Sequence, residues 1–431
     1  MTPIHARIGV LGLALVAGLA APVSATAAPV TASTAPAPTT EERRLDGDVP
    51  QEILRRSGFA SVAPAFARGL DRADSYREAR RLVVREGSAL WRRAVDRVQG
   101  RGPARGDLSR DDDRPLYWAR LGMTRELRTW EPGYRLSEGQ RTALLDELER
   151  ASRGQRDIRL PHARHGNQGG GKGVKRVLLT GFDPFTLDRD IRISNPSGAV
   201  ALALDGTVID TPDGPARVET AVFPVRWQDF ADGAVERALR PYLPKADLFT
   251  TVSQGRVGKF DVERTNGAWR GGFPDNDNVS RTETVPVADP DSQPQWTTTT
   301  LPYGAITAAD TGRFPVIDNT AVTEIPAGGT EPVVRPDGPT PGSTAREGGG
   351  GNYLSNEIAY RATLLRDRLG LHDTLPGGHV HTPVLQFAPD NADPATGTVT
   401  DPAFVRNRLD IVAQTRAIVA VAVSASGQDR S

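Results

Sequence analysis

The sequence contains no cysteine among its 431 residues. This absence excludes a disulfide, a zinc site built on thiolates and a thiol nucleophile. Net charge is absent as well, because Lys+Arg and Asp+Glu number 53 each. That balance argues against a nucleic acid or an anionic membrane as the main partner. After the amino-terminal region, no segment approaches ~18 continuous apolar residues, so we expect a soluble protein without stable membrane insertion.

The first residues have the features of an export signal. His5 and Arg7 give a weakly positive start, and residues 8–21 form an apolar run rich in Leu, Val, Ala and Gly. Small residues follow, so we expect a signal peptide over residues 1–28, with cleavage near Ala25 to Ala28. An uncleaved anchor is the alternative, but the run is short and rich in small residues for a membrane span. The expected location is therefore secreted.

The next part of the chain divides by composition. Residues 29–44 are rich in Ala, Thr and Pro without a hydrophobic period, which predicts a disordered linker. Residues 45–160 carry apolar residues at helical spacing, and Ser137 with Gln140 is typical of a capping box. We expect three or four helices there, with Arg and Glu faces that are solvated surface rather than a binding patch. The glycine-rich residues 161–173 predict a flexible joint.

From Val174 the pattern changes to an alternation of strands and helices. Residues 177–180 form a continuous apolar run, as expected for a strand buried on both faces of a sheet. The alternation predicts an α/β fold over residues 174–425, with a mostly parallel twisted sheet flanked by helices and preceded by the small helical region. Residues 318–342 and 389–400 are rich in Pro, Gly and Thr, and we expect surface insertions there.

Three segments carry the residue types that acyl transfer needs, namely a nucleophile, a base and an acid. Ser355 lies in residues 350–356, a glycine loop that runs into a predicted helix, where free backbone N–H groups can stabilise an oxyanion. His381 and Glu263 lie in apolar segments of the kind that end core strands. His379 nominally shares a strand face with His381, so spacing alone does not choose between the two.

Each of these residues also fits a purely structural role. Ser355 fits a helix cap, Glu263 with Arg264 fits a surface ion pair, and His381 fits a satisfied interior histidine. Taken singly, none of them indicates catalysis.

Seven motifs between Val174 and Phe387 occur in an order typical of one enzyme family. They are Leu178-Leu179-Thr180-Gly181-Phe182-Asp183-Pro184-Phe185 followed by Asn195-Pro196-Ser197, Ser253-Gln254-Gly255-Arg256, Val262-Glu263-Arg264, Pro274-Asp275-Asn276, Thr300-Leu301-Pro302, Gly351-Asn352-Tyr353-Leu354-Ser355-Asn356, and Gly377-Gly378-His379-Val380-His381-Thr382-Pro383. Together they resemble type I pyroglutamyl peptidase, also called pyrrolidone-carboxylate peptidase. The family carries cysteine where this chain has Ser355, and its glycine-rich stretch is one residue longer before the glutamate.

The resemblance implies a single α/β domain that removes an amino-terminal pyroglutamyl residue from a peptide through a covalent acyl-enzyme, without a metal. By motif, Ser355 stands at the position of the nucleophile, His381 at that of the base and Glu263 at that of its partner. A flat, uncharged lactam ring buries well between aromatic side chains. The implied substrate-binding residues are the two ring-packing phenylalanines and two polar residues, Phe182, Phe185, Gln254 and Arg264.

We therefore expect an exported hydrolase, a pyroglutamyl-peptidase-like omega peptidase with serine as nucleophile. The alternative is a catalytically inactive binding or scaffold protein of the same fold. The expected partner is a peptide with an N-terminal pyroglutamate. Nothing in the sequence indicates a metal, another cofactor or a nucleic acid, and an oligomer is possible.

Overall fold

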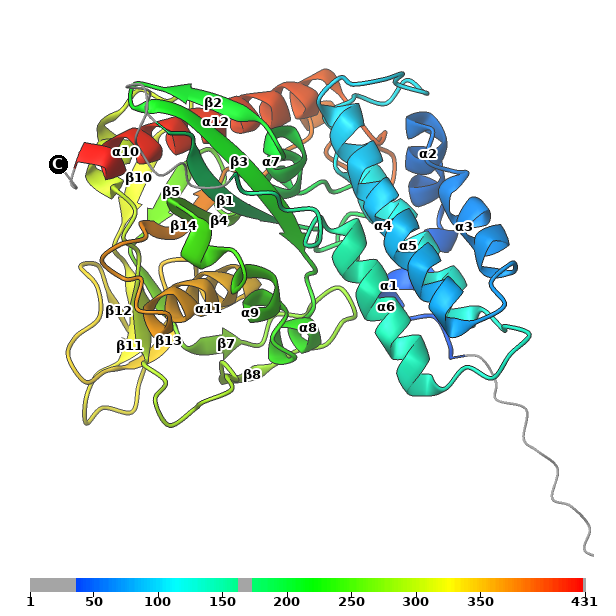
Figure 1. Cartoon of the computed structure of the whole chain (residues 1–431). Helices are drawn as coiled ribbons and strands as arrows, with labels where there is room; N and C mark the ends of the chain where they lie inside the picture. Colours follow the sequence, from blue (N-terminus) through cyan, green and yellow to red (C-terminus); the bar gives the residue numbers. More distant parts are fainter. Residues whose placement is uncertain (1–35, 162–172, 429–431) are drawn as a thin grey trace, which may run out of the picture. The chain divides into compact units, whose positions relative to one another are not determined.

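The computed structural model describes residues 36–161 and 173–428 (Figure 1). The predicted signal peptide lies outside the described residues, as do residues 29–35 of the predicted linker and most of the predicted joint. All described residues belong to one unit, residues 36–431.

Helices form the amino-terminal part of the described chain, as the spacing of apolar residues predicts, but five rather than the expected three or four α-helices lie within residues 45–160. The capping box of Ser137 and Gln140 is present at the start of α6, and the Ser75 side chain accepts the backbone N–H of Glu78 at the start of α4. The helices are α1 (Thr40–Arg43), α2 (Asp48–Ser57), α3 (Val62–Leu70), α4 (Tyr76–Val98), α5 (Arg114–Thr129) and α6 (Glu138–Ser152), with a short 3₁₀ turn at Arg44–Asp46.

A seven-stranded sheet forms the centre of the α/β part, in the order β10-β5-β14-β4-β1-β3-β2. Its strands are β1 (Lys175–Phe182), β2 (Val208–Thr211), β3 (Gly214–Phe223), β4 (Leu248–Gln254), β5 (Phe260–Glu263), β10 (Val316–Asn319) and β14 (Gly377–Thr382). Four neighbouring pairs are parallel, and β5 with β14 and β2 with β3 are antiparallel. The prediction of a mostly parallel sheet flanked by helices is confirmed.

Helices cover both faces of this sheet (Figure 1). Side chains of β1 alternate between the two faces, so Val177 and Leu179 pack into one apolar cluster and Leu178 packs into another. The first cluster contains residues of α7 and α12, and the second contains residues of α9 and α11. The flanking helices are α7 (Pro196–Leu204), α8 (Trp227–Ala231), α9 (Ala234–Leu239), α10 (Tyr303–Ala308), α11 (Leu354–Arg368) and α12 (Pro402–Gln428).

Within the described residues, α12 is long and apolar enough over Pro402–Ser426 to cross a membrane by length and composition alone. In the structure, its Ile418 and Val419 are buried in the apolar cluster on the sheet. Its Arg408 is fully buried and pairs with Asp111. These contacts are those of a core helix, and the absence of stable membrane insertion stays a prediction.

Two segments predicted as irregular are ordered. Residues 40–43 of the predicted linker form α1, where Glu41 and Glu42 are buried, so that prediction is wrong for this segment. The predicted insertion at 318–342 contains strands of a three-stranded antiparallel sheet in the order β12-β11-β13. Those strands are β11 (Val322–Ile325), β12 (Val333–Arg335) and β13 (Thr344–Glu347), and four short strands pair elsewhere, β6 (Thr265–Gly267), β7 (Trp269–Gly271), β8 (Thr282–Thr284) and β9 (Trp296–Thr298).

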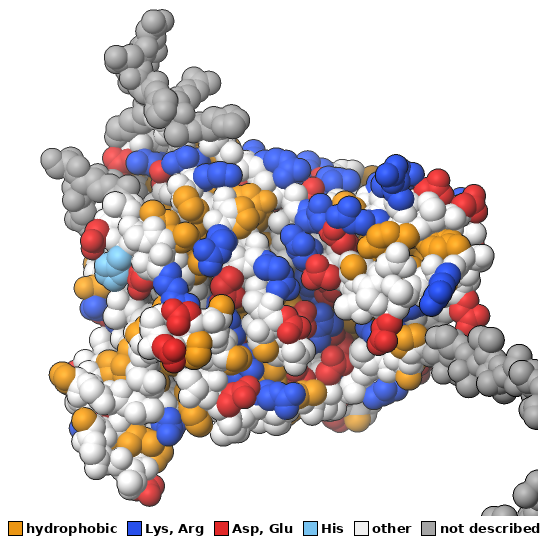
Figure 2. Space-filling view, turned by 60° about the horizontal axis from the view of Figure 1, so that its bottom comes forward, with side chains coloured by type: hydrophobic (Ala, Val, Ile, Leu, Met, Phe, Trp, Pro, Cys, Tyr) orange, Lys and Arg blue, Asp and Glu red, His pale blue; other side chains and the backbone are white. Residues whose placement is uncertain are grey.

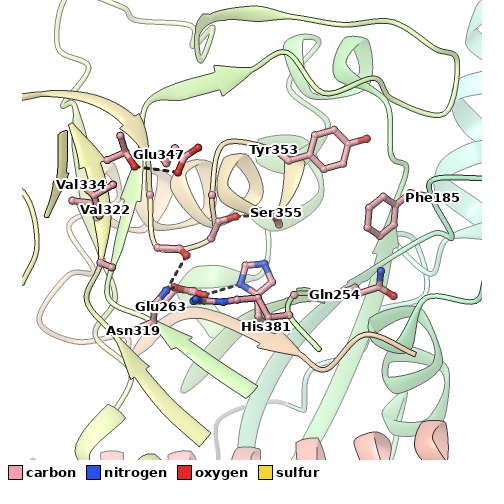
Figure 3. Close-up of a pocket in the computed structure, with 18 residues that line it drawn as sticks. Phe185, Gln254, Glu263, Asn319, Val322, Val334, Glu347, Tyr353, Ser355 and His381 are labelled. Carbon is pink, nitrogen blue, oxygen red and sulfur yellow. Dashed lines mark hydrogen bonds and ion pairs between the residues drawn. The ribbon is translucent and has the colours of Figure 1, made fainter. Parts of the chain in front are cut away.

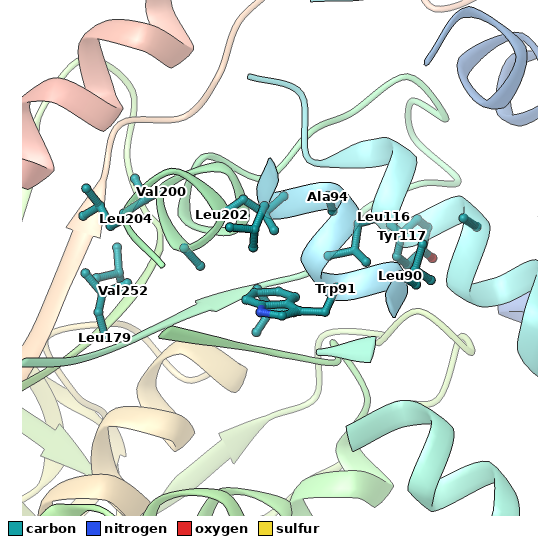
Figure 4. Close-up of a cluster of buried hydrophobic side chains, with 14 of the residues drawn as sticks. Leu90, Trp91, Ala94, Leu116, Tyr117, Leu179, Val200, Leu202, Leu204 and Val252 are labelled. Carbon is teal, nitrogen blue, oxygen red and sulfur yellow. The ribbon is translucent and has the colours of Figure 1, made fainter. Parts of the chain in front are cut away.

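One apolar cluster joins the helical region to the sheet. Leu90, Trp91 and Leu116 of the helices belong to the same buried cluster as Leu179 and Leu202 of the α/β part (Figure 4). The helical region therefore does not have a core of its own among the described residues.

The arginines of the helical region are not all solvated, contrary to the prediction. Arg120 and Arg153 are fully buried and both pair with Asp183, which follows β1. Other charges do lie on the surface, and on the face drawn in Figure 2 the Lys and Arg side chains lie among Asp and Glu side chains. The buried pairs tie the helical region to the loop that follows β1 of the α/β part.

Candidate active site

Glu263 and His381 form a buried pair at one end of the sheet (Figure 3). The His381 Nδ1 and Glu263 Oε1 atoms are 2.7 Å apart, and the residues are 5% and 1% exposed. Asn319, in register with Glu263 across β10 and β5, donates to Glu263 Oε2 at 2.6 Å. The carboxylate thus favours the proton on Nδ1, which leaves Nε2 as an acceptor in the neutral ring. This is how the acid of a catalytic triad orients its base.

The neighbouring His379 has a different environment. It is fully buried, with Nδ1 at 2.7 Å from Thr251 Oγ1 and Nε2 at 2.8 Å from Ser253 Oγ. Burial, with a smaller effect of nearby His381, holds the pKa of His379 well below its usual value. The choice that spacing left open therefore falls on His381, which lines a cavity with both of its candidate partners.

Ser355 lies in the first turn of α11 and does not cap it, because Tyr353 occupies the N-cap position. Its hydroxyl donates to the carbonyl of Gly350 at 3.2 Å, and no hydrogen bond between Ser355 and His381 is present in the described chain. Both side chains nevertheless lie next to Gly350. A Cβ added at Gly350 would lie 2.9 Å from His381 Cε1, so only glycine allows this loop to pass so close to the imidazole.

The start of α11 offers backbone donors beside the serine. The first backbone acceptor used by the helix is the Tyr353 carbonyl, bound by the Glu357 N–H, so the N–H groups of Ser355 and Asn356 precede that ladder. Asn356 anchors this turn, since its side chain accepts the Gly267 N–H at 2.9 Å and donates to the Gly267 carbonyl at 2.8 Å. A fixed helix start with free N–H groups is suited to binding an oxyanion.

Three adjoining hollows surround these residues. The first has a volume of about 450 Å³ and contains Glu263, Ser355 and His381 in its wall. The second, about 590 Å³, lies beyond Phe185 and Gln254, which line both. The third is a narrow apolar pocket of about 30 Å³ lined by Phe182, Phe185, Asn195, Val225, Ser253, Gln254, Tyr353, Leu354 and Ser355.

The structure brings together most of the residues named from sequence. Phe182 is buried and stacks on Phe230 with ring centroids 6.1 Å apart, and Phe185 faces Tyr353 at 6.0 Å. Gln254, the last residue of β4, lines all three hollows. Phe182, Phe185 and Gln254 thus all border the narrow pocket beside Ser355.

Arg264 is the exception among the residues expected to bind substrate. It lines none of the three hollows, because it forms two hydrogen bonds to Asp318, at 2.6 and 2.9 Å, and its guanidinium lies over the Tyr303 ring. Consecutive side chains in extended chain point to opposite sides. Since Glu263 points toward His381, its neighbour Arg264 points away from the site.

Several lining residues were not found from the sequence. They include Asn319 and, from the three-stranded sheet, Val322, Thr323, Val334 and Glu347. The apolar pair Val316-Ile317 just before Asn319 is a short strand signal, but the Pro- and Gly-rich stretch that follows obscured it. No group of three or more potential metal ligands occurs within residues 36–161 and 173–428.

Family models match most of the chain. The model for the PA0049 N-terminal domain matches residues 22–149, and the model for the PA0049 C-terminal domain matches residues 176–289 and 313–386. The uncharacterized protein PA0049 of Pseudomonas aeruginosa is 35% identical in an alignment of length 493 that covers 88% of each chain. The chain belongs to the PA0049 family.

Among solved structures, similar chains are peptidases. Pyrrolidone carboxyl peptidase from Thermococcus litoralis is 20% identical, with 60% of this chain and 97% of that chain covered and a TM-score of 0.41. Pyroglutamyl peptidase I from Bacillus amyloliquefaciens is 19% identical, with 58% and 97% covered and a TM-score of 0.39. The roles of side chains in this PA0049 family member rest on the contacts described above.

Proposed function

We propose that this protein is a serine-dependent amide hydrolase that removes pyroglutamyl residues from the amino terminus of peptides. The observation that carries the proposal is the buried Glu263–His381 pair in one cavity wall with Ser355. A scaffold needs no imidazole oriented by a carboxylate beside a half-buried hydroxyl at a helix start. The motifs that resemble pyroglutamyl peptidase support the choice of substrate.

In the proposed reaction, the Ser355 hydroxyl turns from the Gly350 carbonyl toward His381, which removes its proton as Oγ bonds to the carbonyl carbon of the substrate. The carbonyl oxygen becomes an oxyanion and is stabilised by the N–H groups at the start of α11. His381 then gives the proton to the leaving nitrogen as the amide C–N bond breaks. Water, deprotonated by His381, hydrolyses the ester and restores the serine.

The narrow pocket suits the lactam ring by its composition. Phe182, Phe185 and Val225 provide apolar contacts next to Ser355. At about 30 Å³ the pocket is too small for the ring as it stands. The half-buried Phe185 is the wall that we propose moves on binding, because it also borders the two open hollows.

A second candidate is a binding protein of the same fold without catalysis. The bond from Ser355 to the Gly350 carbonyl favours it, because that bond holds the hydroxyl away from the base. Both candidates share the proposal that the protein is exported, which the apolar run and small residues near the amino terminus support.

Hydrolysis of pyroglutamyl-aminomethylcoumarin distinguishes the two. We expect the parent protein to release the fluorophore and Ser355→Ala to lose at least about 10³-fold in kcat/KM, because the nucleophile is removed. Ser355→Cys serves as the matched variant, since it restores a nucleophile of similar size.

Activity in Ser355→Cys together with an inactive parent would support the binding protein, with an intact pocket and a disabled nucleophile. Unchanged activity in Ser355→Ala would refute the role of Ser355.

A further inference from the structure

The position of His381, the proposed base, indicates in which direction a bound peptide extends from Ser355. This inference rests on the proposed function. The narrow pocket is lined by Ser355 but not by His381, whereas the 450 Å³ cavity is lined by both. The nitrogen that leaves must receive its proton from His381. A peptide with its ring in the narrow pocket therefore extends its remaining residues into the 450 Å³ cavity.

The far wall of that cavity comes from the three-stranded sheet. Val322, Thr323 and Val334 line it together with Glu347, the last residue of β13. Figure 3 shows Val322, Val334 and Glu347 on one side of Ser355 and His381, with Phe185 and Gln254 on the other. The residues that follow the ring in a substrate would thus contact two valines and one carboxylate.

Glu347 is held in place by neutral groups alone. Its carboxylate accepts the Thr323 hydroxyl at 3.1 Å and the Asn352 side-chain amide at 2.8 Å. It has no ion pair in the part of the chain that the structure describes. The adjacent Arg346 turns away, since its guanidinium lies 4.1 Å from the centre of the Trp269 ring and donates to the Ala345 carbonyl.

The cation in this cavity wall, Arg256, already has a carboxylate partner. Arg256 pairs with the buried Asp261 at 3.1 Å, and Lys259 lies 3.1 Å from the same carboxylate. Glu263 shares its charge with His381 and Asn319. Glu347 therefore remains as an oriented charge without a counter-ion, in a concave wall where solvent screening is reduced.

We propose that Glu347 binds a positively charged side chain in the leaving part of the substrate, so that the preferred peptides carry Lys or Arg next to the pyroglutamyl residue. The aliphatic stem of such a side chain packs against Val322 and Val334, while its charged end reaches the carboxylate. Glu347 is thus a specificity residue and takes no part in the chemical steps.

Binding to the full chain carrying Ser355→Ala tests this without any turnover. The probes are pyroglutamyl-lysine amide and pyroglutamyl-norleucine amide, which have nearly the same shape but differ in charge. By titration calorimetry, we expect the lysine probe to bind about tenfold more tightly, as one charge-assisted hydrogen bond gives. The preference should shrink as salt rises.

Adding Glu347→Gln should remove the preference and leave the affinity for the norleucine probe unchanged. Two controls accompany it. Glu331→Gln makes the same charge change at an exposed position of the same chain segment, outside the cavity wall, and should keep the preference. Glu347→Asp keeps the charge and should retain part of it.

Equal affinities for the two probes, a preference that survives Glu347→Gln, or no binding of either probe would overturn the inference. Failure of the proposed hydrolysis looks different. An inactive parent with a Glu347-dependent preference in the Ser355→Ala background would leave this subsite in place and remove only the catalytic role.

Discussion

At the scale of single residues, side-chain direction decides which motif residues reach the candidate site. Gln254 ends β4 and lines all three hollows, whereas Arg264 follows Glu263 and points to Asp318. Both residues occupy motif positions that imply contact with substrate. The structure separates them, and this separation is measurable.

Gln254→Ala should raise KM for pyroglutamyl-aminomethylcoumarin about five- to hundredfold, because a polar contact to the bound substrate is lost. Arg264→Gln should change KM by no more than about twofold, since it breaks only a partly exposed ion pair. Steady-state kinetics of the two variants check this. An effect of Arg264→Gln as large as that of Gln254→Ala would show that the arginine contacts substrate after all.

The glycines of the nucleophile loop are also understood at this scale. A Cβ at Gly349 would lie 2.3 Å from Glu263 Oε2, and one at Gly350 would lie 2.9 Å from His381 Cε1. The glycine run therefore lets the loop pass over the carboxylate and the imidazole. The sequence predicts a glycine loop there but not which side chains the loop must clear.

At the scale of elements, strand order explains how the acid meets the base. Sequence reasoning placed Glu263 and His381 near the ends of core strands, which parallel strands would bring to one edge. In the structure β5 runs antiparallel to β14, and Glu263 stands in register with His379. The side chain reaches His381 from that position, and parallel β10 supplies Asn319 beside it.

The contact between α4, α7 and β3 contains a carboxyl group with a displaced pKa. Asp205 at the end of α7 accepts the Trp91 indole N–H at 3.1 Å and the Thr220 backbone N–H at 3.0 Å. Burial raises the pKa of Asp205 to about 6. Its place at the carboxyl end of a helix also disfavours a negative charge.

The raised pKa makes stability depend on pH with a defined sign. Below about pH 4 the Asp205 carboxyl group is protonated in both the native and the unfolded protein. As the pH rises through about 6, the native protein also loses this proton, and the stability that the proton gave is lost. Asp205→Asn cannot ionise. Its unfolding free energy, relative to that of the parent, should therefore rise by about 1–3 kcal/mol between about pH 4 and pH 7.

Urea unfolding at several pH values measures this difference. Asp210→Asn, at an exposed position of β2, is the matched control and should show no such trend. A pH-independent difference for Asp205→Asn would contradict the assignment.

At the scale of the whole molecule, the helical region holds the loop that forms the candidate pocket. Asp183, two residues before Phe185, pairs with Arg120 and Arg153. Asn276 donates to the Pro184 carbonyl at 2.9 Å and to Glu41 of α1 at 3.1 Å. The helices of the amino-terminal region thus help to hold the loop that carries Phe185.

The sequence was sufficient for the fold class, because local periodicity carries it, and its motifs named three candidate catalytic residues that line one cavity in the structure. It was insufficient for the interlocking of the two regions. The interlocking depends on ion pairs between residues far apart in the chain, such as Arg408 with Asp111. The sequence does not show that the fold buries these charges. The three-stranded sheet was missed for a related reason, since Pro- and Gly-rich composition hides short strands that tertiary contacts stabilise.

The central claim is that Ser355, His381 and Glu263 act together, and the acyl-enzyme tests it most directly. We expect pyroglutamyl p-nitrophenyl ester, an activated ester, to acylate Ser355 faster than the acyl-enzyme is hydrolysed, so that the intermediate accumulates and can be located by mass spectrometry of peptides from the quenched protein. We predict a stoichiometric burst of nitrophenol and a pyroglutamyl group on Ser355, both absent in Ser355→Ala. Turnover without an ester on Ser355, or an unmodified protein that releases no nitrophenol, would contradict the account.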